Sequence, residues 1–350
     1  MGIPTKGVSL MYITAIVPAH NEEKSIVNTV NSLKEQVDQI IVACDNCTDH
    51  TFKNSIETGA QVFATKHNTA RKAGALNQAL ERYVNWNKKD QYIFICDADT
   101  IISKNWVKRA KTLIETGGYD AIGSIFKGDA DRNSMLQFCQ QMEWCRYSNQ
   151  IKRRQKVFVL TGTASMISAR SFEKVHEMNG YYYDENSITE DFSLTLDLKK
   201  IGAKIISPMS CSCTTEIMPT WRLLFLQRRR WYLGALQQTT RRKWDRVLFP
   251  YVTQQFMLIL SVFAFMSLIV FTTYLMLHDM LIFNFLWLFV GVIFALERVV
   301  TVWNQDRESK LFAAMLFPEL IYSFFLQVAY IGAWLQLVFG SIGTWHHVTE

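Results

Sequence analysis

The first hundred residues alternate between short apolar runs and amphipathic segments. Four runs are short, rich in β-branched or aromatic residues and bounded by polar residues, which is typical of buried strands: residues 12–18, 39–43, 60–65 and 92–96. Three intervening segments carry apolar residues at helical spacing: residues 22–36, 50–58 and 72–84. Strands that alternate with helices predict parallel βαβ units in a doubly wound sheet.

The pattern is less regular in residues 120–215. Residues 157–160 are predicted to form a strand that ends at Thr161-Gly162-Thr163, and residues 188–198 a helix introduced by Thr189-Glu190-Asp191. Residues 219–246 mix Trp, Leu and Phe with many Arg. This composition indicates a helix that lies in a membrane interface, and the alternative is a basic helix packed on its own soluble domain.

Three long apolar runs follow. Residues 251–277 and 280–295 carry no charge, and residues 311–340 carry one acid, Glu319, beside Pro318. Because a bilayer crossing takes about 20 apolar residues, three crossings fit. Pro318 offers an alternative for the third run, which it would divide into an interfacial piece and a span.

The charge distribution supports a membrane-bound arrangement. The chain is net +6; residues 251–350 have three Lys or Arg and six Asp or Glu, so residues 1–250 carry about +9. A basic soluble part beside an apolar part suggests a domain held against anionic lipid, and the alternative is a solvated basic surface. Basic residues flank the first and third spans on the side expected to be cytoplasmic: Arg241, Arg242, Lys243, Arg246, Arg307 and Lys310.

Cysteine usage indicates a reducing compartment. The seven cysteines are odd in number and form no compact secreted framework, so we expect free thiols. Cys44 and Cys47 have the spacing of a zinc or redox half-site, but the only other close pair, Cys211 and Cys213, has the wrong spacing for a zinc ribbon. We expect neither a signal peptide nor a span at the start.

Acidic residues follow directly on predicted strands. Asp45 comes after the second strand, and Asp97 and Asp99 come after the fourth. In open α/β sheets ligands bind beyond the carboxyl ends of the strands, so these carboxylates can converge on one crevice. Two carboxylates one residue apart can bind a divalent cation together with phosphate oxygens, and the cation offsets the charge on a leaving diphosphate. The alternative for the pair is a solvated turn.

Two further segments suit a nucleotide. Asp45 can accept hydrogen bonds from a base or a ribose; alternatively it forms an Asx turn that caps the helix near His50. Lys72 opens a helix, where a diphosphate finds cationic and backbone donors; alternatively it is an ordinary lysine at a helix start.

Two later segments suit an acceptor. Asp191 can act as a general base that removes a proton from an acceptor hydroxyl; alternatively Glu190 and Asp191 only stabilise the helix dipole. Residues 227–231 (QRRRW) place cationic phosphate donors beside an aromatic plane on which a sugar can stack. The alternative is a membrane-surface helix whose arginines bind lipid headgroups.

Seven segments in this order resemble the processive family 2 glycosyltransferases, the group of the cellulose, hyaluronan, chitin-oligosaccharide and poly-N-acetylglucosamine synthases. The segments are PAHNE (18–22), the Asp45 segment, RKAGALN (71–77), DAD (97–99), TGT (161–163), TED (189–191) and QRRRW (227–231). The resemblance covers roughly residues 12–245, and the apolar runs that follow fit it too. Cellulose and hyaluronan synthases usually have spans before the catalytic domain, whereas this chain is expected to have none and resembles the chitin-oligosaccharide type in its short C-terminal part.

The resemblance implies a GT-A fold, which is an α/β fold with a mostly parallel, Rossmann-like sheet. The expected division is a cytoplasmic catalytic domain (1–215), interfacial amphipathic helices with the QxxRW motif (216–250), a membrane domain of about three transmembrane helices (251–340) and a tail (341–350). The expected location is the cell membrane, with several crossings.

The resemblance also implies the chemistry, an inverting transfer from a UDP-sugar with Mg²⁺ or Mn²⁺. Asp191 would be the catalytic base, and Asp97 and Asp99 would hold the metal. Substrate contacts would come from Glu22, Asp45, Lys72, Asp97, Gly162, Thr163, Glu190, Gln227, Arg230 and Trp231.

The residues and the resemblance suggest three functions. The leading one is a hexosyltransferase that extends a β-linked polysaccharide from UDP-GlcNAc or UDP-Glc, coupled to export. The second transfers one sugar to a lipid-linked acceptor. The third, a catalytically silent sensor or transport component, would lack the base or the metal pair, and Asp97, Asp99 and Asp191 are all present. Expected partners are the UDP-sugar, a glycan or lipid-linked acceptor and the bilayer, with self-association left open and no nucleic acid.

Overall fold

The computed structural model describes residues 11–88, 90–129, 134–280 and 285–340, without the side chains of residues 286–288. The chain forms two compact units. The first contains the chain up to Asp129 together with Gln150–Glu216, and the second contains Ala130–Asn149 and Ile217–Glu350. Residues 130–149, which we expected within the catalytic domain, therefore group with the C-terminal helices.

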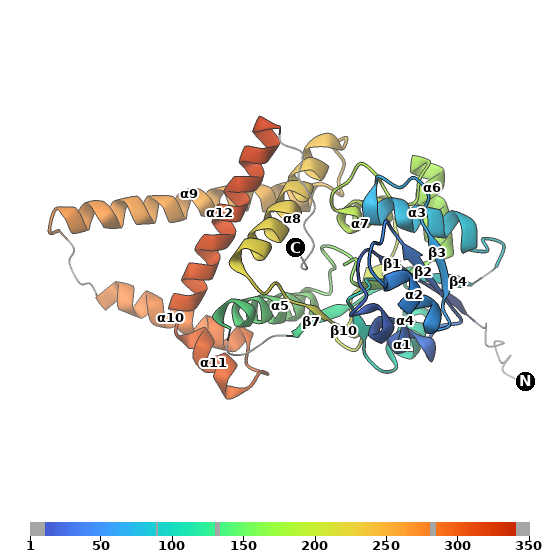
Figure 1. The fold of residues 1–350 in the computed structure, drawn as a ribbon. Helices are drawn as coiled ribbons and strands as arrows, with labels where there is room; N and C mark the ends of the chain where they lie inside the picture. The colour runs from blue at the N-terminus through green and yellow to red at the C-terminus, as the bar shows by residue number, and fades with distance from the viewer. Residues whose placement is uncertain (1–10, 89, 130–133, 281–284, 341–350) are drawn as a thin grey trace, which may run out of the picture. The chain divides into compact units, whose positions relative to one another are not determined.

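A seven-stranded sheet forms the centre of the first unit (Figure 1). Its strands, in spatial order, are β3 (Gln61–Ala64), β2 (Gln39–Cys44), β1 (Tyr12–Ala19), β4 (Gln91–Cys96), β8 (Ala164–Ser168), β6 (Ala121–Gly123) and β9 (Ile205–Ile206). The first four strands are parallel, β8 pairs antiparallel with β4 and β6, and β9 pairs parallel with β6. The mostly parallel α/β sheet expected from the alternating pattern is confirmed.

Helices cover both faces of this sheet. They are α1 (Ile26–Lys34), α2 (Thr51–Glu57), α3 (Arg71–Tyr83), α4 (Trp106–Gly117), α6 (Ala169–Asn179) and α7 (Glu190–Lys200). Side chains alternate along a strand, so Ile13, Ala15 and Val17 of β1 pack with α1 and α4, whereas Ile16 packs with α3, α6 and α7. Burial on both faces explains why the strands are continuous apolar runs.

The first unit also contains a second, smaller sheet of three strands. Its order is β5 (Ile101–Ile102), β10 (Ser212–Glu216) and β7 (Ile125–Asp129). β10 pairs antiparallel with β5 and parallel with β7. Because β5 begins two residues after Asp99, this pairing brings Thr215 to the Asp99 carboxylate, with 3.4 Å between Oγ1 and Oδ1.

The strand predicted at residues 157–160 is wrong. The segment is irregular, and the strand of this region is β8, which follows the Thr161-Gly162-Thr163 segment instead of preceding it. Side chains of α7 take the place of a strand partner: the Leu160 amide donates to Thr195 Oγ1 (2.9 Å), and Lys199 Nζ donates to the Val157 carbonyl (2.6 Å). With its backbone groups bonded in this way, the segment stays buried without pairing in a sheet.

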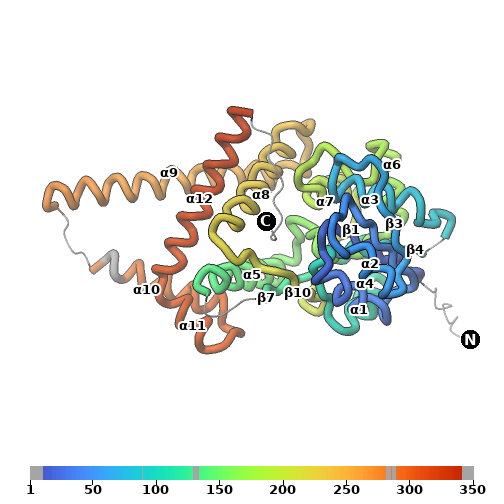
Figure 2. Tube along the Cα trace, viewed as in Figure 1, coloured from blue at the N-terminus to red at the C-terminus, as the bar shows by residue number. Residues whose placement is uncertain are grey.

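The second unit is helical (Figure 2). Its helices are α5 (Met135–Arg154), α8 (Trp221–Arg241), α9 (Phe249–Leu277), α10 (Phe285–Thr301), α11 (Arg307–Ala314) and α12 (Phe317–Phe339), the last turn of α5 belonging to the first unit. α8 and α12 pack side by side. A buried cluster with members from α5, α8, α11 and α12 includes Met142, Leu224, Phe312 and Tyr322.

Two helices of the described residues, α9 and α12, are long and apolar enough to cross a membrane. None of the most apolar stretch of α9 is buried within the chain, so its apolar surface requires an apolar environment from elsewhere. The predicted run at residues 280–295 falls partly on residues outside the described ranges, and α10 has 17 residues; a third crossing stays a prediction. The expected tail at residues 341–350 also lies outside the described residues.

The last apolar run is divided, as the position of Pro318 indicated. α11 ends at Ala314, and α12 starts at Phe317 with Pro318 in its first turn. Leu316, between the two helices, has a φ of 55°. Proline fits the first turn of a helix, where its missing N–H is not needed.

Candidate active site

The turn after β4 carries the two aspartates of the DAD segment. The Asp97 amide donates to the Thr163 carbonyl (2.9 Å), which fixes this turn against the TGT segment. The Asp99 carboxylate accepts from Thr100 Oγ1 (3.0 Å) as well as from Thr215. Two segments that are distant in sequence thus meet at the carboxyl end of a central strand, where ligands of open α/β sheets bind.

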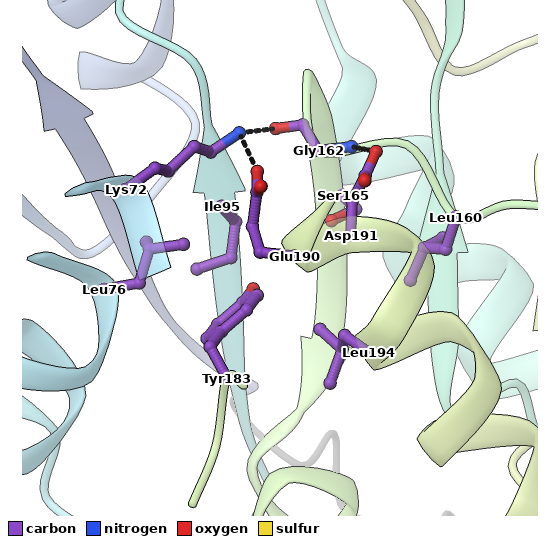
Figure 3. Close-up of a pocket in the computed structure, with 10 residues that line it drawn as sticks. All are labelled: Lys72, Leu76, Ile95, Leu160, Gly162, Ser165, Tyr183, Glu190, Asp191 and Leu194. Carbon is purple, nitrogen blue, oxygen red and sulfur yellow. Dashed lines mark hydrogen bonds and ion pairs between the residues drawn. The ribbon is translucent and has the colours of Figure 1, made fainter. Parts of the chain in front are cut away.

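Lys72, at the start of α3, connects these segments with the TED segment. Its Nζ lies 2.5 Å from Asp97 Oδ1 and 3.1 Å from Glu190 Oε1, and it donates to the Gly162 carbonyl at 3.4 Å. Figure 3 shows the ammonium group directed between Glu190 and Gly162. The ammonium group of Lys72 therefore connects its own RKAGALN segment with the DAD, TGT and TED segments.

The charges of this group are strongly coupled. Burial by itself lowers the pKa of Lys72, but the charges of Asp97 and Glu190 outweigh that effect and raise its pKa well above the ordinary value. Burial raises the pKa of Asp97 to about 6, although Lys72 acts in the opposite direction. The lysine thus stays charged, whereas negative charge at Asp97 is only partly compensated.

Asp191 is held in the first turn of α7. Its Oδ2 accepts from the Gly162 amide (3.2 Å) and its Oδ1 from the Phe192 amide (2.7 Å). Burial and the neighbouring charge of Glu190 raise the pKa of Asp191 to about 6. A carboxylate with this pKa is ionised at neutral pH and is still basic enough to accept a proton.

Gly162 allows the close approach of these groups. A Cβ atom at this position would lie 2.8 Å from Lys72 Nζ and 3.4 Å from Asp191 Cβ. Any side chain would therefore displace the ammonium group or the base. The hydroxyl of the adjacent Thr163 donates to Thr161 Oγ1 (3.1 Å).

Glu22 interacts electrostatically with Asp97, Asp99 and Glu216, and we call these four carboxylates the acidic region. Its carboxylate accepts from Ser25 Oγ (2.6 Å). Burial raises the pKa of Glu22 to about 7, and the charges of Asp99 and Glu216 add to the effect. Burial also raises the pKa of Asp99, again with a contribution from Glu216.

Asp45 lies at the end of β2 and is nearly buried. Its Oδ1 accepts from Thr65 Oγ1 (2.6 Å), Asn68 Nδ2 (2.8 Å) and Asn46 Nδ2 (3.1 Å). The expected alternative, an Asx turn at the start of α2, is made by Asp49, whose Oδ1 accepts from the Thr51 amide (2.9 Å). Asn68 also donates to the Arg71 carbonyl, so Asp45 is connected to the start of α3.

A pocket lies beneath Lys72 and Asp191 (Figure 3). Its polar lining includes Gly162, Glu190 and Asp191, and its apolar floor comes from the following residues: Leu76, Ile95, Leu160 and Leu194. Asp45, Asp97 and Asp99 are not among the residues that line it, although Asp97 contacts Lys72 at its edge.

Sequence reasoning missed two residues of this region. Tyr183 lines the pocket from the loop before α7, and Asn77 holds it there by accepting from the Tyr183 amide and donating to its carbonyl, both at 2.9 Å. Glu216 reaches the acidic region because β10 pairs with β5. The Asn in RKAGALN was a signal for the first contact, but nothing in the local sequence around Glu216 indicated the second.

The acidic region suits a hard divalent cation. Among the described residues, no group of three or more His, Cys, Asp or Glu side chains could hold a metal by itself. Asp97 and Asp99 supply carboxylate oxygens, the donors that Mg²⁺ and Mn²⁺ prefer. Burial is the main cause of their raised pKa values, and neighbouring carboxylates add to it: Asp99 for Asp97, and Glu216 for Asp99. A cation that completes its shell with phosphate oxygens fits such a pair.

The remaining predicted residues lie on α8, in the second unit. Gln227 Oε1 is buried and has no hydrogen-bond partner among the described residues. The Trp231 ring is 36 % exposed, and the Arg228 guanidinium lies 4.3 Å from its centroid. Arg230 lies between them in sequence, on the same helix. The predicted roles of Gln227, Arg230 and Trp231 toward the substrates stay predictions.

The chain is similar to several known proteins in sequence and in fold. Residues 14–176 match the family model described as Glycosyl transferase family 2. A poly-beta-1,6-N-acetyl-D-glucosamine synthase of Staphylococcus aureus (strain COL) is 27 % identical over 234 residues, which are 64 % of this chain and 54 % of that protein. The protein of the same name from strain MSSA476 has the same identity and coverage. The chain thus spans about half the length of the curated relatives it matches.

A solved structure with the same architecture is a mannosyltransferase from Pyrobaculum calidifontis in complex with GDP-Man and Mn²⁺. It is 15 % identical, with a TM-score of 0.59, over 94 % of this chain and 88 % of that chain. At this identity the likeness establishes the GT-A-like α/β fold alone. Residues 14–176 thus form a domain that matches Glycosyl transferase family 2, within a chain that is similar to a poly-beta-1,6-N-acetyl-D-glucosamine synthase and has a GT-A-like fold.

Proposed function

We propose that the enzyme transfers N-acetylglucosamine or glucose from its UDP-sugar to the growing end of a β-linked glycan, with inversion at the anomeric carbon, at the cytoplasmic face of the cell membrane. The observation that carries the proposal is the contact of Lys72 with Asp97, Glu190 and Gly162. This contact gathers groups for a diphosphate and a general base, Asp191, around one small volume.

Asp191 would act on the acceptor. As the acceptor oxygen attacks the anomeric carbon, its proton passes to the Asp191 carboxylate and the bond from that carbon to the diphosphate oxygen breaks. Inversion needs one base and no covalent intermediate on the enzyme. The bonds from the Gly162 and Phe192 amides fix the base in one orientation, which is the geometric requirement for efficient proton transfer.

Lys72 would act on the leaving group. Its ammonium lies on the side of the pocket where Asp97 begins the DAD turn, so it can pair with a diphosphate oxygen as negative charge develops there. Asp97 and Asp99 would hold Mg²⁺ or Mn²⁺, which when bound supplies positive charge to the departing diphosphate. Glu190 keeps the lysine in place when no phosphate is bound.

Asp45 and Glu22 would bind the nucleoside. The bonds from Thr65, Asn68 and Asn46 all go to Oδ1 of Asp45, so the second oxygen can accept from a base N–H. An acceptor at the end of β2, separated from β4 by β1 at the same edge of the sheet, matches the way open α/β sheets bind nucleotides.

Gln227, Arg230 and Trp231 of α8 would serve the acceptor and the diphosphate. The buried, unpartnered Gln227 Oε1 is an acceptor for a substrate hydroxyl or amide, and Trp231 offers part of its ring for stacking on a sugar. The name of the curated relatives supports a polymeric product, and α9 and α12 support attachment to a membrane. Thr163 beside Gly162 would line the acceptor path.

The direct test is a donor and product screen. Purified protein in nanodiscs is incubated with a panel of nucleotide sugars that includes GDP-mannose, and nucleotide release is measured. We expect release from UDP-GlcNAc or UDP-glucose and a ladder of products on a gel. One added sugar on a lipid acceptor would replace polymerisation by single transfer, and release from GDP-mannose alone would disprove the UDP assignment.

Substitution of the base separates chemistry from binding. Asp191→Asn keeps the shape and can keep one of the two hydrogen bonds from the Gly162 and Phe192 amides, but it cannot take a proton, so turnover is expected to fall by roughly 10²- to 10⁴-fold. Binding of UDP, measured by calorimetry, should stay within about twofold. Glu190→Gln is the matched control: it loosens Lys72 and is expected to weaken UDP binding more than Asp191→Asn does. Undiminished turnover in Asp191→Asn would refute the base assignment.

The pKa of the base predicts a pH profile. Because burial and Glu190 raise the pKa of Asp191 to about 6, the active carboxylate is present above that pH and is lost as the pH falls through it. Turnover at saturating substrates is expected to level off above about pH 7 and to drop by about tenfold per pH unit well below the pKa. A rate that stays constant down to about pH 4.5 would contradict a base with this pKa.

The aspartate pair predicts metal dependence. Excess chelator should abolish nucleotide release, and Mg²⁺ or Mn²⁺ should restore it, because the cation that Asp97 and Asp99 would hold offsets the charge on the leaving diphosphate. Ca²⁺, which prefers larger and more flexible shells, serves as the comparison ion. Full activity in excess chelator would show that Lys72 alone stabilises the leaving group.

A further inference from the structure

Arg228 lies inside the QRRRW segment but is placed differently from an arginine that binds lipid headgroups. Its side chain is 4 % exposed. Its Nη2 donates to Glu143 Oε2 of α5 (2.8 Å), and the Tyr322 hydroxyl of α12 donates to the same oxygen (2.5 Å). Three helices of the second unit therefore meet at one carboxylate oxygen.

The same guanidinium also contacts Trp231. Its Cζ lies 4.3 Å from the centroid of the indole ring, and three residues of helix separate the two positions, which places them on one face of α8. A planar guanidinium can donate hydrogen bonds at its edge while its face stacks on an aromatic ring. Glu143 thus fixes the group on which one side of Trp231 rests.

The burial of this arginine requires an explanation. Removing a guanidinium from water costs free energy unless the group is paired. An arginine that served only for packing or for lipid contact would not need to be buried in an ion pair with a glutamate. Trp231, by contrast, keeps 36 % of its surface exposed. The buried and paired Arg228 guanidinium thus lies next to an indole ring that remains accessible to a ligand.

We propose that Glu143 and Tyr322 are positioning residues for the acceptor: they hold Arg228, and through Arg228 they hold the Trp231 indole in the orientation on which an acceptor sugar stacks. This inference rests on the proposed function, because stacking of the acceptor on Trp231 is part of it. It assigns to two residues outside the motif a role in acceptor affinity, separate from the donor site of the first unit.

Kinetics with both substrates test the proposal. The acceptor is a soluble β-linked N-acetylglucosamine tetrasaccharide, and the donor is UDP-GlcNAc. Glu143→Ala is expected to raise the acceptor KM by roughly three- to tenfold and to leave the donor KM unchanged. Glu143→Gln, which keeps a hydrogen-bond acceptor for Arg228, should restore part of the affinity. Arg229→Gln is the matched control, since Arg229 contacts Phe225 instead of Trp231, and the acceptor KM should not change.

A second variant covers the case in which Glu143→Ala does not fold. Tyr322→Phe removes only the hydroxyl that donates to Glu143, and it should raise the acceptor KM in the same direction by about twofold. In a Trp231→Ala background, neither Glu143→Gln nor Tyr322→Phe should raise the KM further, because their effect passes through the ring. Additive effects in that background would overturn the proposal.

A spectroscopic arm separates this proposal from the proposed function. The protein is labelled with 5-fluorotryptophan, and the Trp231 fluorine resonance is assigned with Trp231→Phe. We expect Glu143→Gln and Tyr322→Phe to shift this resonance and Arg229→Gln to leave it in place. An unchanged resonance in both cluster variants overturns the positioning role, even if no nucleotide sugar is a substrate. A shifted resonance with an unchanged acceptor KM overturns the role in acceptor binding.

Discussion

A single mostly buried ammonium group organises the catalytic unit. Lys72 contacts Asp97, Glu190 and the Gly162 carbonyl, and these contacts tie the starts of α3 and α7 to the ends of β4 and the TGT segment. Without a cation at this point, the carboxylates of Asp97, Glu190 and Asp191 would repel one another. Each of them would then be driven toward its protonated form. The glycine at 162 is the steric counterpart of this arrangement, because it leaves room for the ammonium and the base.

Much of the fold follows from periodicity. The strands predicted in the first hundred residues match β1 to β4 within two residues at each end, because their apolar runs are buried on both faces. Parallel strands share one edge at their carboxyl ends, which is why Asp45, Asp97 and Asp99 could be placed at the same edge of the sheet from sequence. Asp45 also lies at that edge, where Asn68 donates to it, but it does not line the pocket, and the sequence did not show this.

The parts that could not be predicted depend on tertiary partners. Val157 to Leu160 have the composition of a strand, yet Lys199 and Thr195 satisfy their backbone groups. Glu216 joins the acidic region only through the pairing of β10 with β5, and Glu143 meets Arg228 across 85 residues of chain. Local composition holds no information about such partners, whereas the order of short motifs held much of it for the catalytic groups.

The division of the chain into units has a consequence for biosynthesis. α5 leaves the ribosome early, but its Glu143 and Arg146 are bonded to Tyr322 and Glu319, 179 and 173 residues further on. The helical unit therefore cannot close until α12 has been translated, because Glu143 can pair earlier with Arg228 of α8 but the partner of Arg146 is Glu319 of α12. Completion of the helical unit is thus linked in time to translation of α12, the helix that carries Glu319 and Tyr322.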